Sequence, residues 1–281
     1  MLPIYSLIVV KVKKLLKETD IGILCIDGPT AAGKTILAEG LAKILTKELS
    51  INVDFYRLDW TLKERIEREN DLKVLMNDNE DFYFEGELHM HLEKYKKFLQ
   101  EIRLINKNNA NDAKLINKFH VKELYSRENN GKCDGEYTYE FNSKKTLIIC
   151  EGHYTSRSEF RNLIDLNICL LAERQELLDR KINRVKGYRS PQAAIDYFNK
   201  IDIPSFSYHI SRFHNNVDIF IDNTNYKKPF VLSKKNIDQW LLHELNNNKI
   251  CIVNKKINFD HLYKKIFSSS KIFNLISLEE F

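Results

Sequence analysis

Short apolar runs alternate with charged, amphipathic stretches along the first 225 residues, and this alternation predicts where strands and helices lie. Residues 21–27, IGILCID, form a continuous apolar run bounded by turn signals, which is typical of a buried strand. Residues 34–48 place leucines at helical spacing, so a helix is expected next. Residues 51–59, INVDFYRLD, then predict a second strand that ends at Asp59.

The alternation continues to a last apolar run near residue 220. Helices are expected at 61–70, 88–104 and about 173–186, a loop and hairpin at 125–141, and strands at 146–150, within 163–172 and at 217–223. Strands that alternate with helices favour a parallel sheet covered on both faces. We therefore predict an α/β fold with a five-stranded parallel sheet, and a ligand site at the carboxyl ends of its strands.

The first twenty residues, MLPIYSLIVVKVKKLLKETD, are not typical of a signal peptide. Their apolar stretch precedes the basic residues, and no small-residue cleavage site follows. A short amphipathic helix is expected instead, with an apolar face formed by Leu7, Ile8, Val10, Val12 and Leu15. No run approaches the ~18 apolar residues of a membrane span, so no membrane association is expected.

Composition changes this picture little. The formal charge of +5 suits anionic ligands such as nucleotides, but it is too small to argue for nucleic acid. The five cysteines include no C-x-x-C pair, so neither a disulfide framework nor a zinc site is indicated. A reducing cytoplasm is the expected compartment. Nothing in the sequence indicates an oligomeric state.

One segment carries specific chemistry. Residues 28–35, GPTAAGKT, match the phosphate-binding pattern G-x-x-x-x-G-K-[ST] between a predicted strand and a predicted helix. The loop comprises Gly28, Pro29, Thr30, Ala31, Ala32, Gly33, Lys34 and Thr35. Its glycines permit backbone angles that aim several N–H groups at an anion, and the helix adds its positive end. Lys34 is expected to reach the β- and γ-phosphates of ATP, and the Thr35 hydroxyl to bind Mg²⁺.

The other motifs in the chain narrow the class of nucleotide-binding protein to which this loop could belong. The pattern N-K-x-D of GTPases is matched only by NKID at 199–202, in a stretch expected to be helical, and the third predicted strand ends in Glu-Gly where a motor-type ATPase usually has Asp-Glu. Over about residues 21–225 the chain resembles the uridine kinase and phosphoribulokinase group of P-loop kinases. The resemblance rests on CIDGPTAAGKT, RLDW, LIICEGHY, LLDRKINRVKGYR and VDIFIDNTN. We accordingly expect a kinase domain at 1–225 and an extension of unclear role at 226–281.

The resemblance assigns roles to two acids. Asp59 matches the acid that contacts the acceptor hydroxyl as general base, although Asp54 in the same strand could be aligned instead. Asp59 could also be the N-cap of a following helix. Glu151 matches the acid that holds Mg²⁺, and the alternative is a plain turn at Glu151-Gly152.

The basic segment near residue 180 resembles the family's mobile lid, whose arginines clamp phosphates. Arg180 and Arg184 are four residues apart and share a helix face, and Arg189 follows a glycine. A solvated basic helix is the alternative. The sequence departs from the family at Val185, where an acid often follows the second arginine. Asn223 and Thr224, after the last strand, match a loop near the adenine, or form a simple turn.

The sequence says least about the molecule that accepts the phosphoryl group. Asp81 and Phe82 are the nearest match to the family's acceptor segment, although its proline is missing. Trp60 and Tyr125 are further candidates. An aromatic face with a carboxylate suits a nucleoside such as uridine or cytidine. The alternatives are another acceptor (a sugar phosphate, vitamin precursor, antibiotic or modified base) and a non-enzymatic nucleotide-binding module.

Overall fold

A computed structural model describes the chain at residues 3–70, 89–110, 118–141, 145–187, 189–233, 237 and 239. Its centre is a six-stranded sheet in the order β2-β5-β1-β6-β7-β8. The strands are β1 (Ile21–Asp27), β2 (Asn52–Arg57), β5 (Thr146–Glu151), β6 (Leu166–Leu171), β7 (Ile219–Asp222) and β8 (Phe230–Val231). The first five in sheet order are parallel, as predicted, and the short β8 adds an antiparallel edge that the sequence did not predict.

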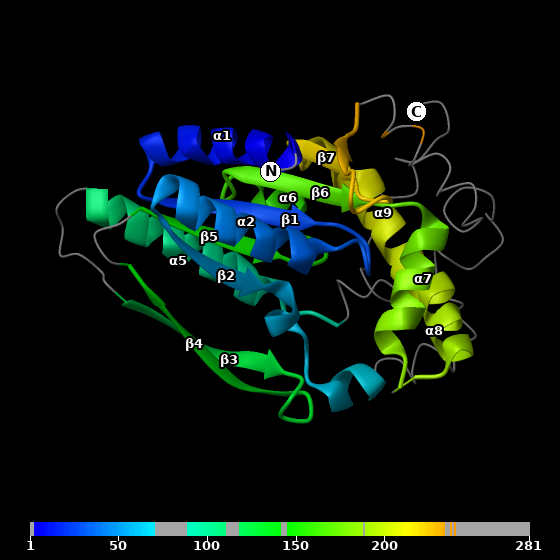
Figure 1. The fold of residues 1–281 in the computed structure, drawn as a ribbon. Helices are drawn as coiled ribbons and strands as arrows, with labels where there is room; N and C mark the ends of the chain where they lie inside the picture. Colours follow the sequence, from blue (N-terminus) through cyan, green and yellow to red (C-terminus); the bar gives the residue numbers. More distant parts are fainter. Residues whose placement is uncertain are drawn as a thin grey trace.

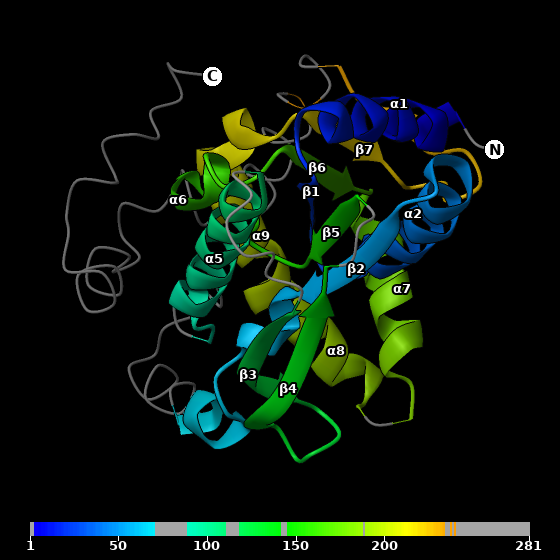
Figure 2. The same cartoon turned by 90° about the vertical axis from the view of Figure 1, so that its left-hand side faces the viewer.

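Helices cover both faces of the sheet, which gives the predicted three-layer α/β architecture (Figures 1 and 2). One face carries α1 (Pro3–Glu18), α2 (Lys34–Leu49) and α7 (Arg174–Val185), and the other carries α5 (Leu92–Ala110), α6 (Ser158–Arg161) and α9 (Ile203–Phe213). Strand β1 is buried along its whole length because both faces are covered. This burial explains why its sequence is a continuous apolar run.

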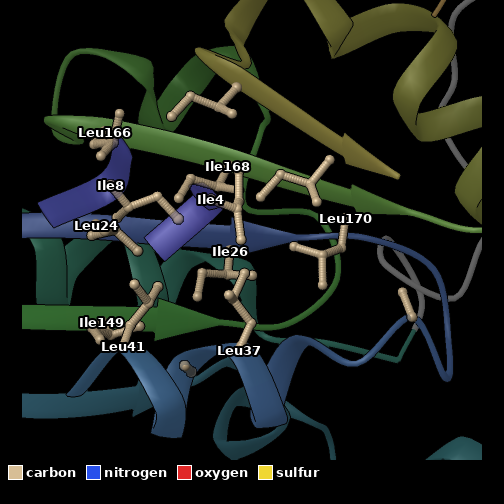
Figure 3. Close-up of a cluster of buried hydrophobic side chains, with 14 of the residues drawn as sticks. Ile4, Ile8, Leu24, Ile26, Leu37, Leu41, Ile149, Leu166, Ile168 and Leu170 are labelled. Carbon is tan, nitrogen blue, oxygen red and sulfur yellow. The ribbon is translucent and has the colours of Figure 1, made fainter. Parts of the chain in front are cut away.

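The larger hydrophobic core lies between α1, α2 and the sheet (Figure 3). There Ile4 and Ile8 of α1 pack with Leu37 and Leu41 of α2 against β1, β5 and β6. The predicted apolar face of α2 is confirmed, since Leu37, Leu41 and Leu45 are all buried.

The helix expected at the N-terminus is present, but its buried face differs from the prediction. The buried side chains are Ile4, Ile8, Val12 and Leu16, at a strict spacing of four. Val10 and Leu7, which were expected on the apolar face, are 65% and 36% exposed. Apolar residues lie on several sides of this helix, so its sequence alone does not show that Ile4 and Leu16 are buried; packing against the sheet decides which side is covered.

Two connections shape the carboxyl edge of the sheet. Strand β2 ends at Arg57, and a 3₁₀ turn η1 (Leu58–Thr61) follows, so Asp59 lies just beyond the strand and not at its last position. The predicted hairpin is formed by β3 (Lys118–Ser126) and β4 (Lys132–Glu140) and begins earlier than expected. It lies below the sheet in Figure 1, beside the short helical segment 65–70.

After α7 the chain continues through α8 (Pro191–Tyr197) and a π-helical segment η2 (Phe198–Asp202) into α9. Strand β8, within residues 226–281, pairs with β7, and Ile237 packs beside Cys169 and Leu171. Among the described residues, every helix is too short or too polar to cross a bilayer.

Candidate active site

The loop between β1 and α2 is shaped to surround an anion. Gly28 has φ +147°, and a Cβ at this position would lie 2.4 Å from the carbonyl oxygen of Leu170, so only glycine fits. Ala31 is left-handed at φ +60°, a conformation that side chains rarely adopt. Gly33, also left-handed, is the N-cap of α2, which places the positive end of this 16-residue helix at the loop.

Lys34 lies inside this loop. Its Nζ donates hydrogen bonds to the carbonyl oxygens of Gly28 and Pro29, both at 2.8 Å. Burial lowers the pKa of Lys34, and the nearby carboxylates of Glu151, Asp27 and Asp59 oppose that shift. The ammonium group is therefore already held where an anion in the loop would meet it.

Thr35 and Glu151 meet beside the loop, although they come from different elements. The Thr35 hydroxyl is within hydrogen-bonding distance of both carboxylate oxygens of Glu151, at 3.1 and 3.2 Å. Burial raises the pKa of Glu151, while Lys34 and the Thr35 hydrogen bond act in the opposite direction.

This hydroxyl and carboxylate fit Mg²⁺. A hard cation prefers oxygen ligands, and Mg²⁺ is commonly held by one or two carboxylates together with substrate phosphates and waters. In the described ranges no group of three or more His, Cys, Asp or Glu could hold a metal by itself. The Thr35 hydroxyl and the Glu151 carboxylate could together supply oxygen ligands to such an ion.

Asp59 reaches the same edge from the other side. Its half-exposed side chain accepts a hydrogen bond from Arg127 of the β3–β4 turn, at 2.5 Å. A Cβ on Gly152 would lie 2.5 Å from Leu58 Cβ, so glycine permits the close approach of η1 to the loop after β5. Asp59 lies inside η1, whose N-cap position is Arg57, so Asp59 does not cap this turn.

Asp54, the alternative acid, is placed differently. It lies within β2 opposite Ile148 of β5. Its carboxylate accepts hydrogen bonds from the Tyr137 hydroxyl at 2.6 Å and from the Phe55 backbone N–H at 2.8 Å. This acid is therefore tied to the hairpin, away from the phosphate-binding loop.

A cavity of about 530 Å³ opens between the phosphate-binding loop, η1, the hairpin and α7; we call it the basic cavity. Its charged lining residues are Asp59, Arg65, Arg68, Glu69, Arg127, Lys181, Arg184, Arg189 and Asp202. Thr30, Tyr125 and His153 also line it. Burial and the field of Lys34 lower the pKa of His153. Cations outnumber carboxylates, so the cavity favours anions.

A second cavity of about 320 Å³, which we call the apolar cavity, lies on the other side of the loop. Its lining residues are Ile4, Tyr5, Gly33, Ile36, Leu37, Leu170, Arg180, Ile221, Asn223, Tyr226 and Pro229. The Asn223 amide donates to the Ala32 carbonyl at 2.8 Å, and a Cβ on Gly33 would lie 2.8 Å from that amide nitrogen. Thr224 accepts from the backbone N–H of Glu173 at 2.9 Å, which ties its loop to the start of α7.

Arg180 and Arg184 of α7 line different cavities. Arg180 donates to the carbonyl oxygens of Asn223 and Thr224, both at 2.8 Å, and lines the apolar cavity. Arg184 donates to the Thr30 hydroxyl at 3.2 Å and lines the basic cavity. Helical spacing predicted that Arg180 and Arg184 share a face, but their guanidinium groups line cavities on opposite sides of the phosphate-binding loop. Arg189 also lines the basic cavity, with its guanidinium 5.0 Å from the centre of the Tyr197 ring.

A buried Asp–His pair beneath the loop was not predicted from the sequence. Asp27 accepts hydrogen bonds from the backbone of Gly28 at 2.7 Å and Ser156 at 2.9 Å, and faces His209 Nε2 at 2.9 Å. Burial alone would raise the pKa of Asp27, but His209 and these hydrogen bonds lower it below its usual value. The position of Asp27 before Gly28 was a signal, whereas His209 lies too far along the chain to be paired with it by pattern.

Of the residues predicted to contact the acceptor, some line the basic cavity and others do not. Tyr125 lines the basic cavity, where its hydroxyl accepts from Arg68 at 2.8 Å. Trp60 instead packs between the rings of Tyr56 and Tyr137, at centroid distances of 5.5 and 5.3 Å. Asp81 and Phe82 lie outside the described residues.

Comparison with known proteins identifies the fold. No protein-family model and no curated protein matches the sequence. D-glycerate 3-kinase from Cryptococcus neoformans superposes with a TM-score of 0.55 at 12% identity, over 82% of this chain and 99% of that one. A proposed fructose transport system kinase from Silicibacter sp. gives 0.53 at 15% identity, over 74% and 94%. A proposed uridine kinase from Bacillus stearothermophilus gives 0.48 at 18% identity, over 75% and 96%.

The first two likenesses show that the chain has the fold of P-loop kinases. The resemblance inferred from the sequence motifs is thereby confirmed at the level of the fold.

Proposed function

We propose that this protein is an ATP-dependent kinase that transfers the γ-phosphoryl group of Mg-ATP to a hydroxyl of a small molecule. One observation carries the proposal: a single phosphate-binding loop separates two cavities of opposite character. Gly33 lines the apolar cavity and Thr30 lines the basic one. A nucleotide with its base in the first and its terminal phosphate at the second would present that phosphate to an acceptor.

The apolar cavity suits the base of the nucleotide. Tyr5, Ile36 and Leu37 offer apolar surface, and the Arg180 guanidinium offers a flat face on which a ring could stack. Arg180 is held there by two backbone carbonyls. Asn223 and Thr224, expected near the adenine, would support this wall of the cavity and the loop beneath it.

The loop and its neighbours would then hold the phosphates. Lys34 can exchange its two loop carbonyls for phosphate oxygens, and Arg184 can reach the terminal phosphate from α7. Thr35 and Glu151 would hold Mg²⁺, which, when bound, neutralises charge that develops on the phosphoryl oxygens. Phosphoryl transfer depends on such positioning and charge neutralisation more than on covalent chemistry.

Asp59 would serve as general base. Its carboxylate lines the basic cavity, and its charge acts on Lys34, so it lies close to the loop. As the acceptor oxygen bonds to the γ-phosphorus and the bond to ADP breaks, the hydroxyl proton would pass to Asp59. Arg127 orients the carboxylate while leaving its second oxygen for the acceptor.

The acceptor favoured from the sequence is a nucleoside such as uridine or cytidine. Tyr125, on the basic cavity, supports it as an aromatic surface, while Trp60 is engaged in packing. The excess of cations around the basic cavity is better matched to an anionic acceptor.

Turnover of labelled ATP tests the proposal directly. Purified protein, Mg²⁺ and γ-¹⁸O-labelled ATP would be incubated with nucleosides, sugars, sugar phosphates, hydroxy acids and cofactor precursors, and with a metabolite extract. We expect ADP release that depends on one acceptor, and a product that carries the labelled phosphoryl group by mass spectrometry. ATP binding without any labelled product would favour the nucleotide-binding module.

The division of the α7 arginines makes a further prediction. Arg184→Lys keeps the charge but loses the planar fork, so kcat should fall by about tenfold or more. Arg180→Lys should instead raise KM for ATP several-fold with kcat little changed, because Arg180 lines the apolar cavity. Steady-state kinetics of both variants would show the split. Wild-type constants for both would mean that α7 is only a solvated basic helix.

A further inference from the structure

The basic cavity extends well beyond the part that a nucleotide needs. Thr30, Arg184 and Arg189 lie where the terminal phosphate would be. Arg65 and Arg68 belong to the helical segment 65–70, which lies beside the hairpin and away from the loop after β1 (Figure 1). The far end of the cavity thus has its own pair of arginines.

Ion pairs already engage other cations of the cavity. Lys181 is bound to Asp202 at 2.7 Å, and Arg127 is bound to Asp59 at 2.5 Å. Within the described ranges, no carboxylate forms an ion pair with Arg65 or Arg68. Their two charges therefore remain for a ligand at the far end.

Arg68 is held in place by groups that do not cancel its charge. Its Nε donates to the Lys63 carbonyl at 3.1 Å, and a terminal nitrogen donates to the Tyr125 hydroxyl at 2.8 Å. The guanidinium also lies 5.0 Å from the centre of the Tyr125 ring. A side chain held in this way has lost most of its rotamer freedom before a ligand arrives, which favours binding.

Arg65 is held through its backbone. Its N–H donates to the Gly131 carbonyl at 2.9 Å, and a Cβ on Gly131 would lie 2.8 Å from Arg65 Cβ. The hairpin turn therefore packs closely on this arginine. Its side chain is exposed and lines the cavity.

His89, which also lines the basic cavity, lies close to these cations. Burial, with Arg68 and Lys63 nearby, lowers the pKa of His89 to about 3. His89 therefore stays neutral at physiological pH, and the positive charge of this end comes from the arginines.

We propose that the acceptor is an anionic hydroxyl compound, whose phosphate or carboxylate group is bound by Arg65 and Arg68 while its hydroxyl faces Asp59. Guanidinium groups bind both anions bidentately, and two of them fix an orientation. The acceptor oxygen bonds to the γ-phosphorus, ADP leaves, and Asp59 takes the proton. This inference rests on the proposed kinase function, and it replaces a neutral nucleoside with a charged acceptor.

Binding of small anions to the protein loaded with Mg²⁺ and a non-hydrolysable ATP analogue tests the site, because the phosphate-binding loop and the position of the terminal phosphate are then both occupied. Inorganic phosphate and acetate would be titrated by calorimetry at constant ionic strength, against wild type, R65Q, R68Q and the double variant. K122Q, which removes an exposed cation from the hairpin beside this segment, is the matched control. Phosphate binding at least tenfold tighter than acetate binding indicates a phosphorylated acceptor, and the reverse order a carboxylate.

We expect either variant to weaken anion binding by about tenfold or more, the scale of a charge-assisted hydrogen bond, and K122Q to leave it unchanged. Because Arg65 is exposed, R65Q carries the test even if R68Q loosens its segment, and R68K restores the charge. If the double variant binds each anion as tightly as wild type does, the inference is overturned. So does efficient phosphorylation of uridine with the same kcat/KM in wild type and R65Q, an outcome in which the kinase function stands.

Discussion

Asp59→Asn is expected to lower turnover by about 10²–10⁴-fold, the usual contribution of a general base, while leaving Mg-ATP binding nearly unchanged. The amide oxygen of asparagine can still accept the hydrogen bond from Arg127, so the local structure should persist. Only the capacity to take the acceptor proton is lost. The rate constant measured at saturating ATP and acceptor, with calorimetry of Mg-ATP binding, would separate these effects.

Asp54→Asn is the matched control, because it makes the same change in the same segment. Asp54 is bonded to Tyr137 and to its own strand, so a small loss of stability is expected with turnover largely retained. Loss of turnover in Asp54→Asn but not in Asp59→Asn would mean that the second strand has been aligned with the wrong acid. If neither substitution matters, transfer depends on positioning and Mg²⁺ alone.

Lys34→Ala should lower kcat by at least about 100-fold, the scale of removing one donor that stabilises charge in the transition state. The ammonium is buried in the loop and held by two carbonyl oxygens, so no other side chain can take its position. Lys43→Ala, which removes an exposed cation from the same helix, should have no such effect. Circular dichroism would verify that both variants fold, and ATP-dependent turnover that survives Lys34→Ala unchanged would contradict the assignment.

The sequence predicted best what is encoded locally. The buried strands read as apolar runs, and the glycine loop is identified by residues that are adjacent in the chain. Asp59 and Glu151 could be placed at one edge because parallel strands end together. These features need only short windows of sequence and one rule of topology.

The features that were missed depend on contacts between distant segments. Packing against the sheet decides which side of α1 is buried, and the sequence of the helix alone does not. Arg65 and Arg68 read as members of a charged helix, and only the hairpin makes them the wall of a cavity. The Asp27–His209 pair joins the end of β1 to α9. The two cavities flanking the loop are likewise assembled by folding, so a shared helix face could not show that Arg180 and Arg184 line different ones.

The two glycines of the loop should have different evolutionary histories. A side chain on Gly28 would meet the backbone oxygen of Leu170, and no substitution elsewhere can remove a backbone atom. A side chain on Gly33 would meet the amide of Asn223, which a shorter residue at 223 would relieve, although the left-handed backbone would still resist the change. Among relatives of this chain, position 28 should therefore be invariant. Departures from glycine at position 33 should be rare and accompanied by a smaller residue at position 223.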